Sequence, residues 1–374
     1  MLPFFNHSKS ANLDWIGESI CETVREALAS QGVLALDRED RLEAFRRLSL
    51  RPNAVLTRAS VIKVGEALDA AILIYGQYEL APSAPSGGAE PASRGALRIT
   101  ARILDLRPIK QGPEFAEFGP LEDLAALEAR LAWQALQFVI PNHAPSQQEF
   151  LNAHPHIRLD AVESYVRGLL APSPEQKHRF FTQAARLDER YSQPCFQLGK
   201  IYWAGKDYRI AAGWLERVTP ADSHYMEAQY FLGLSRYYTG DIAGAEKCFA
   251  LVAGSVPLNE VYNNLGAAQL RRGAPAALEN FRKALEGDSA DPDYHFNLGY
   301  ALWKSGRFEE AADSFRASLD RNAEDTEAVS LLGRALKKDG PRPGDPRSEG
   351  RERLKTSYEE AAYRQLQAEL RSNK

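Results

Sequence analysis

The sequence predicts a multidomain protein in which a mixed α/β domain at the N-terminus precedes an all-α superhelix of repeated helix pairs. Three observations carry this prediction. A Leu-Gly pair recurs at a nearly constant interval in the second half of the chain, and the N-terminal part instead mixes strand and helix patterns. The length of 374 residues also exceeds that of one ordinary domain. We expect an α/β domain at 1–140, a linker at 141–157, repeats at 158–340, a Pro/Gly linker at 341–350 and a final helix at 351–374.

Composition excludes several classes of function. Lys plus Arg total 46 and Asp plus Glu total 50, and this near-neutral balance gives no electrostatic footprint for nucleic acid. Three cysteines are too few for a disulfide framework. No run of 18 apolar residues is present, so we expect no integral membrane span. No signal peptide is visible, which indicates a cytoplasmic protein from the chain as given, or a periplasmic or envelope-associated one if an upstream signal was omitted.

The first 140 residues favour a compact domain with the order β-α-β-α-α-β-β-(β)-α. Strands are expected where apolar residues run together or alternate with polar ones, and helices where apolar residues recur every three or four positions. A Pro/Gly/Ser-rich stretch between two of the strands should form a flexible hairpin loop. The expected elements are a strand ending at 2–5, helix 13–28, strand 33–36, helices 37–48 and 60–68, strand 70–76, loop 82–91, strand 97–103 and helix 121–138.

This N-terminal stretch resembles a known family. Leu2-Pro3-Phe4-Phe5-Asn6, followed by the segment Leu13-Asp14-Trp15-Ile16-Gly17-Glu18-Ser19-Ile20, is similar to the opening of the amino-terminal domain of TolB and its relatives, in which a strand ending in Leu-Pro-Phe leads to a first helix. The segments 66–76, 97–102 and 120–124 fit the same layout. The resemblance covers residues 1–140 and implies a bacterial envelope or signalling accessory role with no chemistry of its own.

The repeats set the architecture of the rest of the chain. The glycines of the Leu-Gly pairs, spaced by 34, 33, 33 and 34 residues, are Gly199, Gly233, Gly266, Gly299 and Gly333. After each of the first four glycines come a small residue and then a large apolar one: Ala211 with Leu215, Ala245 with Phe249, Ala277 with Phe281, and Ala311 with Phe315. Each unit reads as two helices joined by a turn, and the glycine lets the two helices approach closely. A single unit cannot bury its apolar face alone, so the units must stack.

This pattern resembles the tetratricopeptide repeat family over residues 160–340. The resemblance implies a curved array whose concave side is lined by the first helix of each unit. The unit at 158–190 is degenerate and is expected to be the opening cap. The unit from Thr326 has only its first helix before a Pro/Gly run at 340–346, which must end that helix.

A last helix is expected from Arg351 to Leu370. The apolar residues that recur every four positions are Leu354, Tyr358, Ala362, Leu366 and Leu370. Stacked repeats need a polar-faced cap at each end, so we expect this helix to fold back and cap the open end of the solenoid. The alternative is a helix that docks a partner.

The sequence shows no catalytic or metal-binding constellation. His154-Pro155-His156 with Asp160 is the only local histidine cluster, and it lacks further ligands, so we expect solvated linker histidines rather than a zinc site. The glycines and lysine at 199–206 fail the spacing of a phosphate-binding loop. The segment 17–21 is no nucleophile elbow, since Cys21 replaces the second glycine. We therefore predict a protein that is not an enzyme and that needs no cofactor or metal.

The concave face of the repeats is the expected binding site. Counting from the Leu-Gly pairs places aromatic, Lys, Arg and Asn side chains there, and the aromatic ones could equally be core. The candidate groove residues are Phe196, Lys200, Trp203, Tyr230, Tyr237, Tyr238, Asn263, Arg271, Phe296, Tyr300, Trp303 and Lys304. Repeats that grip heat-shock chaperones carry Lys, Asn and Arg at set positions, but Phe196, Phe231 and Glu260 replace them here, although Lys200 and Asn264 are polar. An extended or helical peptide with apolar anchors fits better.

These observations predict a non-enzymatic scaffold or adaptor that binds a peptide or protein partner in the concave groove, within a bacterial envelope-associated or signalling complex. The alternative is a regulatory protein whose N-terminal domain binds a small ligand or nucleotide at a cleft near Trp15 and Tyr75. The sequence gives no indication of the oligomeric state.

Overall fold

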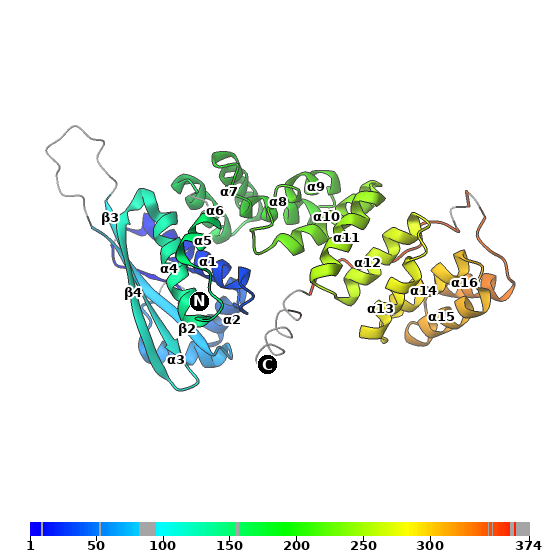
Figure 1. Ribbon diagram of the computed structural model, residues 1–374, viewed down its shortest axis with the longest axis horizontal. Coiled ribbons are helices and arrows are strands. Elements are labelled where there is room, and N and C mark those ends of the chain that lie inside the picture. The colour runs from blue at the N-terminus through cyan, green and yellow to red at the C-terminus, as the bar shows by residue number, and fades with distance from the viewer. Residues whose placement is uncertain are drawn as a thin grey trace. The chain divides into compact units, whose positions relative to one another are not determined.

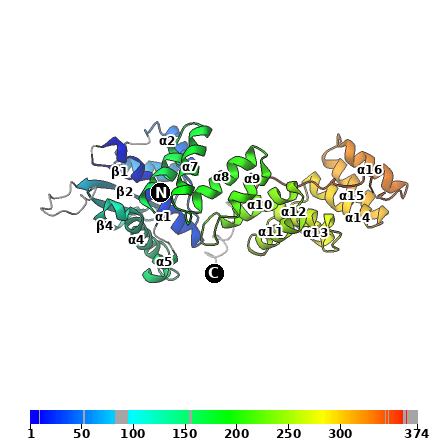
Figure 2. The same ribbon diagram turned by 90° about the horizontal axis from the view of Figure 1, so that it is seen from above.

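The computed structural model describes residues 1–8, 10–51, 54–81, 95–153, 157–342, 344–345, 347–359 and 363. The described chain contains sixteen α-helices and four strands, and it forms two compact units. Unit 1 comprises Met1–Gln197 with Thr219–Ser223, and unit 2 comprises Leu198–Val218 with the described residues from His224 onward. Figure 1 labels the elements, and Figure 2 shows them from a second side. The expected hairpin loop at 82–91 and the cluster His154-Pro155-His156 lie outside the described residues.

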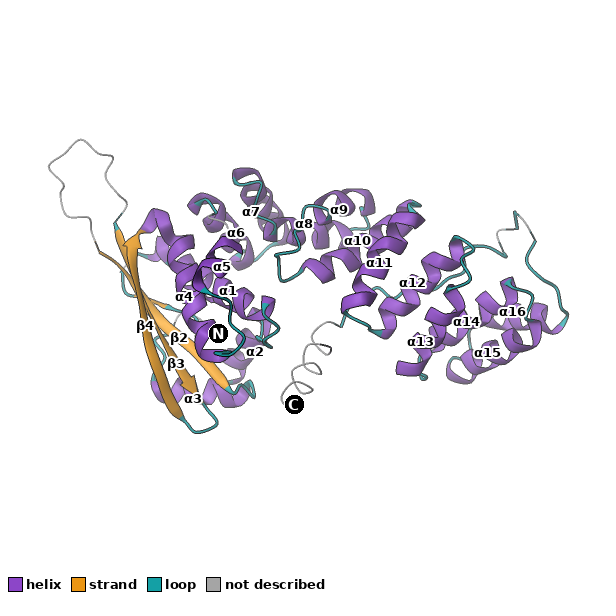
Figure 3. Cartoon of the chain, viewed as in Figure 1, coloured by secondary structure: helices purple, strands orange, loops and turns teal. Residues whose placement is uncertain are grey.

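A sheet forms one layer of unit 1 (Figure 3). It has four strands, in the order β1-β2-β3-β4. Its strands are β1 (Phe5–Asn6), β2 (Ile72–Ala81), β3 (Ala96–Asp105) and β4 (Lys110–Pro120). β1 pairs parallel with β2, and the other two pairings are antiparallel. The alternation of apolar and polar residues in β3 buries Leu97, Ile99 and Ala101 on the face toward the core, as the sequence predicts.

Seven helices complete unit 1. They are α1 (Trp15–Ser30), α2 (Arg38–Arg47), α3 (Arg58–Ala67), α4 (Leu124–Val139), α5 (Gln147–Ala153), α6 (Leu159–Leu170) and α7 (Pro174–Leu187). α4 packs on β3, β4 and α1, so its apolar face closes the core over the sheet. Phe45, Val61, Leu73 and Leu104 form a second buried cluster between α2, α3 and the sheet.

The strand expected at 33–36 is wrong. α1 ends in a turn in which Gly32 has a φ of 75° and the Val33 N–H donates to the Leu28 carbonyl. The chain then runs without strand pairing to Asp37, whose side chain caps α2 by accepting from the Asp40 N–H. The short apolar run therefore belongs to a loop between two helix ends.

The repeat region consists of antiparallel helix pairs. Its helices are α8 (Gln193–Ala204), α9 (Tyr208–Leu215), α10 (Tyr225–Thr239), α11 (Ile242–Ser255), α12 (Asn259–Arg271), α13 (Ala277–Gly287), α14 (Pro292–Lys304), α15 (Phe308–Arg321) and α16 (Thr326–Leu336). Gly240, Gly273 and Gly306 end the first helix of their pairs with φ of 89°, 69° and 78°, a conformation that glycine adopts without cost. α16 ends before the Pro/Gly run, as expected.

The glycine of each Leu-Gly pair faces the second helix of its own unit. A Cβ atom on Gly233 would lie 2.7 Å from the Phe249 ring, and one on Gly266 would lie 2.9 Å from Phe281. Gly299 stands in the same relation to Phe315, at 3.0 Å. The large apolar residue of the repeat motif therefore fills the space that the glycine leaves open.

We predict that Gly233→Ala destabilises the repeat region by about 1–3 kcal/mol, because the added methyl group collides with the Phe249 ring in a packed interface. The thermal unfolding midpoint of the helical circular dichroism signal measures this loss. Gly254→Ala is the matched control, since a Cβ there meets no atom within 4 Å and α11 gains a better helix former. Equal effects of the two substitutions would contradict the packing role of Gly233.

A buried carboxyl group stands out in the core of unit 1. Glu128 on α4 is 1% exposed, and the Thr23 hydroxyl donates to its Oε2 at 3.0 Å. Burial raises the pKa of Glu128 to about 8 from an ordinary 4.5, although the hydrogen bond from Thr23 opposes the shift. Between these two values the folded chain holds a proton that the unfolded chain has released, so stability falls as pH rises through this range.

Glu128→Gln should remove this loss of stability at higher pH, because the amide stays neutral at every pH. We expect the variant to match the wild type near pH 5 and to exceed it by about 1–3 kcal/mol near pH 8. Thermal unfolding midpoints across this range measure the difference. Glu66→Gln, at an exposed position, is the control and should show no such trend. A change in stability of Glu128→Gln that is the same at every pH would contradict the raised pKa of Glu128.

Candidate functional site

The face formed by the first helices of the repeats, named here the groove, is occupied by the chain's own C-terminal segment. Residues 348–358, named here the strap, follow the Pro/Gly run and contact α10, α12, α14 and α16, the first helices of successive units. The expected helix from Arg351 is wrong for residues 351–358, which are not helical. The rest of that expected helix and its capping role lie outside the described residues, apart from residues 359 and 363. Residues 351–358 are not helical because buried side chains of the groove bond the main-chain groups that a helix would pair with one another.

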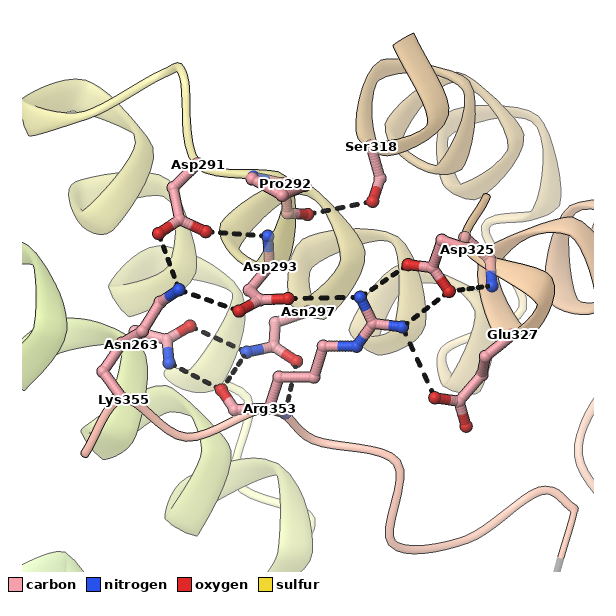
Figure 4. Close-up of polar contacts among 11 residues, drawn as sticks. Asn263, Asp291, Pro292, Asp293, Asn297, Ser318, Asp325, Glu327, Arg353 and Lys355 are labelled. Carbon is pink, nitrogen blue, oxygen red and sulfur yellow. Dashed lines mark hydrogen bonds and ion pairs between the residues drawn. The ribbon is translucent and has the colours of Figure 1, made fainter. Parts of the chain in front are cut away.

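Asparagine side chains bind the strap backbone as a neighbouring strand would. Asn297 accepts from the Arg353 N–H at 2.9 Å and donates to the Arg353 carbonyl at 2.7 Å (Figure 4). Asn264 forms the same two bonds with Lys355, both at 2.8 Å. Asn263 also donates to the Arg353 carbonyl, at 2.8 Å. An amide group can pair with one N–H and one C=O together, so these residues fix the register of the strap without reading its side chains.

Two tyrosines add further bonds to the strap backbone. The Tyr230 hydroxyl donates to the Lys355 carbonyl at 2.7 Å, and the Tyr300 hydroxyl donates to the Ser348 carbonyl at 2.7 Å. Burial raises the pKa of Tyr230 far above its ordinary value, which keeps the hydroxyl protonated as a donor. The groove therefore holds main-chain atoms from Ser348 to Lys355.

The basic side chains of the strap meet acidic residues at the starts of α14 and α16. The Arg353 guanidinium bonds both oxygens of Asp325, at 2.6 and 2.9 Å, and also contacts Asp293 at 3.2 Å (Figure 4). Its Cζ lies 3.5 Å from the centre of the Phe296 ring. A planar fork between a carboxylate and an aromatic face is an arrangement that arginine fills better than lysine.

Two more cations flank Arg353. Lys355 Nζ lies 2.6 Å from Asp291 and 2.8 Å from Asp293. Arg351 lies 3.2 Å from Glu327. These strap cations occupy alternate positions of the sequence, and in an extended chain alternate side chains point to the same side.

The charged state of these pairs is stable near neutral pH. Burial raises the pKa of the Asp325 carboxyl, but bonds from Arg353 and the Ala328 N–H outweigh burial and hold it below the ordinary value. Burial lowers the pKa of the Lys355 ammonium, but bonds to Asp291 and Asp293 outweigh it and raise the pKa above the ordinary value. The pairing therefore persists across the neutral range and weakens when acid protonates the carboxylates.

The opposite side of the strap carries one acid. The Glu352 side chain is 0% exposed; it accepts from Arg271 at 2.8 Å and from the Tyr237 hydroxyl at 3.2 Å. Arg271 is the last residue of α12, where the helix dipole favours a cation. The groove thus has an acidic edge at helix N-termini and a basic point at a helix C-terminus.

The structure brings half of the predicted groove residues to the strap. The six that contact the strap are Tyr230, Tyr237, Asn263, Arg271, Phe296 and Tyr300. Lys200 instead pairs with Glu227, and the Trp203 ring makes tilted contacts with Tyr208 and Tyr238, which stack on each other. The remaining three predicted residues are Phe196, which is buried, Trp303, which is buried and donates to the Asp339 carbonyl, and Lys304, which lies 5.6 Å from the Tyr300 ring centre.

Sequence reasoning missed several residues that hold the strap. They are Asn264, Asn297, Asp291, Asp293, Asp325 and Glu327. A signal was present for the amides, because Asn264 and Asn297 each directly precede the Leu of a Leu-Gly pair in consecutive units. Asp291 and Asp325 look like ordinary helix caps, which they also are.

The structure places the two residues near which a cleft is expected, Trp15 and Tyr75, in different surroundings. Trp15 lines a cavity of about 530 Å³ with Ser10, Leu80 and Leu121 among its neighbours. Tyr75 packs against the buried cluster around Phe45 instead. Among the described residues, no group of three or more His, Cys, Asp or Glu side chains could hold a metal ion. None of the described helices has the length and apolar character needed to cross a bilayer.

Comparison with known proteins agrees with the repeat assignment. Residues 267–326 match the tetratricopeptide repeat family model, which supports a tetratricopeptide repeat protein. The chain has no sequence match among curated proteins. Among solved structures it is similar to YrrB, titled a TPR protein with an unusual peptide-binding site, at 18% identity over 45% of this chain and 87% of that one, with a TM-score of 0.37.

Two further solved structures are forms of MamA. The first is 19% identical over 41% of this chain and 91% of that one, with a TM-score of 0.38. The second, residues 41 to the end of MamA from Desulfovibrio magneticus RS-1, is 23% identical over 43% of this chain and 92% of that one, with a TM-score of 0.37. The resemblance of the N-terminal domain to that of TolB stays a prediction.

Asn297→Ala should loosen the strap, since it removes both bonds to the Arg353 main chain. We expect hydrogen exchange at the strap amides to accelerate roughly tenfold or more. Mass spectrometry of peptides that cover residues 348–358 measures the rate. Asn322→Ala is the matched control, because Asn322 is exposed after α15. Unchanged exchange in Asn297→Ala would mean that the amide does not hold the strap.

Proposed function

We propose that this chain is a non-enzymatic interaction protein whose repeat groove binds an extended segment of another polypeptide. The paired bonds from Asn264 and Asn297 to the strap main chain carry the proposal. Main-chain groups are common to all polypeptides, so a groove that pairs with them can accept a segment from a partner in place of the strap. The strap is then the occupant that the partner displaces.

The groove depends on having an occupant. Asn263, Asn264 and Asn297 are 0% exposed with the strap in place. A buried amide that loses its partner costs about 1–3 kcal/mol unless water or another chain replaces the bond. An incoming segment that restores the same bonds offsets this cost, whereas a globular surface without a free main chain does not. We therefore propose an extended peptide, rather than a folded surface or a helix, as the ligand.

We also propose that the N-terminal domain connects this groove to a bacterial envelope-associated or signalling complex. The resemblance of residues 1–140 to the TolB amino-terminal domain supports this setting. A second candidate function is binding of a small ligand by unit 1. A cavity of about 640 Å³, lined by Thr23, Glu128 and Tyr191 among others, supports that alternative.

The test of the main proposal uses the full-length chain with the strap released. Arg353→Glu with Lys355→Glu places two acids against the acidic edge and leaves every groove residue native. A labelled synthetic peptide with the sequence of residues 347–358 should bind this variant and should bind the wild type at least about tenfold more weakly, because the tethered strap competes at an effective concentration near the millimolar range. Fluorescence anisotropy measures both affinities.

Arg342→Glu with Arg347→Glu is the matched control. It changes the net charge by the same amount at two exposed positions before the strap, and it should behave as the wild type. Hydrogen exchange at residues 348–358 verifies release. Lack of peptide binding by a variant whose strap is shown to be released would refute the proposed function.

A further inference from the structure

The charged contacts of the strap indicate what kind of segment the groove accepts. We propose that the partner carries an extended segment with the charge order basic-acidic-basic-neutral-basic, as in Arg351-Glu352-Arg353-Leu354-Lys355 of the strap. This inference rests on the proposed function, and it adds a side-chain preference to a groove that otherwise reads only main chain.

Register is the first step of the argument. The amides of Asn297 and Asn264 pair with residues two apart, Arg353 and Lys355. A segment bound by both amides has one fixed alternation, since successive side chains of an extended chain point to opposite sides. Every ligand residue therefore faces either the acidic edge or Arg271, and a shift by one residue exchanges the two.

The central position selects arginine. Four acids surround the three strap cations, and Asp325 receives two bonds from one guanidinium. The guanidinium at the same time lies over the Phe296 ring, with its Cζ 3.5 Å from the ring centre. Lysine at this position would give a single point charge without the fork or the stacking. We therefore expect the affinity to fall when this arginine is replaced by lysine, whereas a general acidic surface would bind both peptides equally.

The acidic position is equally constrained. The Glu352 side chain is fully buried between Arg271 and Tyr237. A basic residue there would be buried against Arg271, and a small neutral one would leave Arg271 without its carboxylate. A partner segment with only basic residues should thus bind more weakly than one with the alternating order.

A partner protein fits better than a second copy of this chain as the donor of the segment. The strap of a second copy is chemically identical to the strap already in place. The tethered strap has the advantage of an effective concentration near the millimolar range, so an equal competitor in solution does not displace it. A different protein can carry a better-matched or multivalent segment.

The test measures binding of four synthetic peptides to the released full-length variant Arg353→Glu with Lys355→Glu. The peptides are the sequence 347–358, the same sequence with Arg353→Lys, the same with Glu352→Arg, and one with residues 351 and 352 exchanged. We expect the first to bind best, the Arg353→Lys peptide several-fold more weakly, and the last two at least tenfold more weakly. Raising the salt concentration should reduce these differences, because ion pairs are screened.

A charge exchange provides the specific control. Arg271→Glu, added to the released variant, should restore binding of the Glu352→Arg peptide and weaken the unmodified peptide. Equal binding of all four peptides would overturn the charge order and leave the proposed function intact, whereas no binding by any peptide would overturn the proposed function itself. Concentration-dependent dimers of the wild-type chain in which the strap is exchanged, measured by mass photometry, would overturn the assignment of a different protein as the donor.

Discussion

Each helix pair of the repeat region depends on a glycine that has no space for a side chain. Gly233, Gly266 and Gly299 face a phenylalanine ring of the second helix at distances that exclude a Cβ atom without rearrangement. This contact fixes how the two helices pack and therefore where the first helix of each unit lies. The amides of the groove follow from it: Asn264 and Asn297 hold equivalent positions in consecutive units and bind strap residues two apart. Between these two units the strap advances by two residues of extended chain, a step of about 6.6 Å.

The electrostatics of the groove derive from the ends of the same helices. Asp291 and Asp325 cap α14 and α16, where the N-terminal dipole and the unpaired N–H groups favour a carboxylate. Each carboxylate also binds a strap cation, so one residue type serves both helix formation and ligand binding. Arg271 ends α12, where the dipole favours a cation, and it pairs with Glu352. The charge order along the strap therefore complements the acidic residues at the helix N-termini and the basic residue at a helix C-terminus.

The sequence could predict what local packing decides. The spacing of the Leu-Gly pairs identifies the helix pairs, and alternation identifies β3. It could not predict the strap, because Leu354 and Tyr358 fit a helical period and only the basic residues at 351, 353 and 355 carry the two-residue period of an extended chain. Which period wins depends on buried partners up to 125 positions away, such as Tyr230, which bonds the Lys355 carbonyl. For a related reason only half of the predicted groove residues contact the strap. Counting from the Leu-Gly pairs identifies the face of each first helix, whereas the path of the strap decides which residues of that face it contacts.

A groove with buried amides has consequences for how a partner is bound. The strap satisfies Asn263, Asn264 and Asn297, so the free energy of partner binding is the difference between two sets of nearly equivalent main-chain bonds. Main-chain bonds cancel in this difference, because any extended segment makes them. The side-chain contacts at Asp325, Phe296 and Arg271 do not cancel, and they decide whether a given segment replaces the strap. Self-occupation therefore changes a surface that would hold any extended peptide into one that discriminates among them.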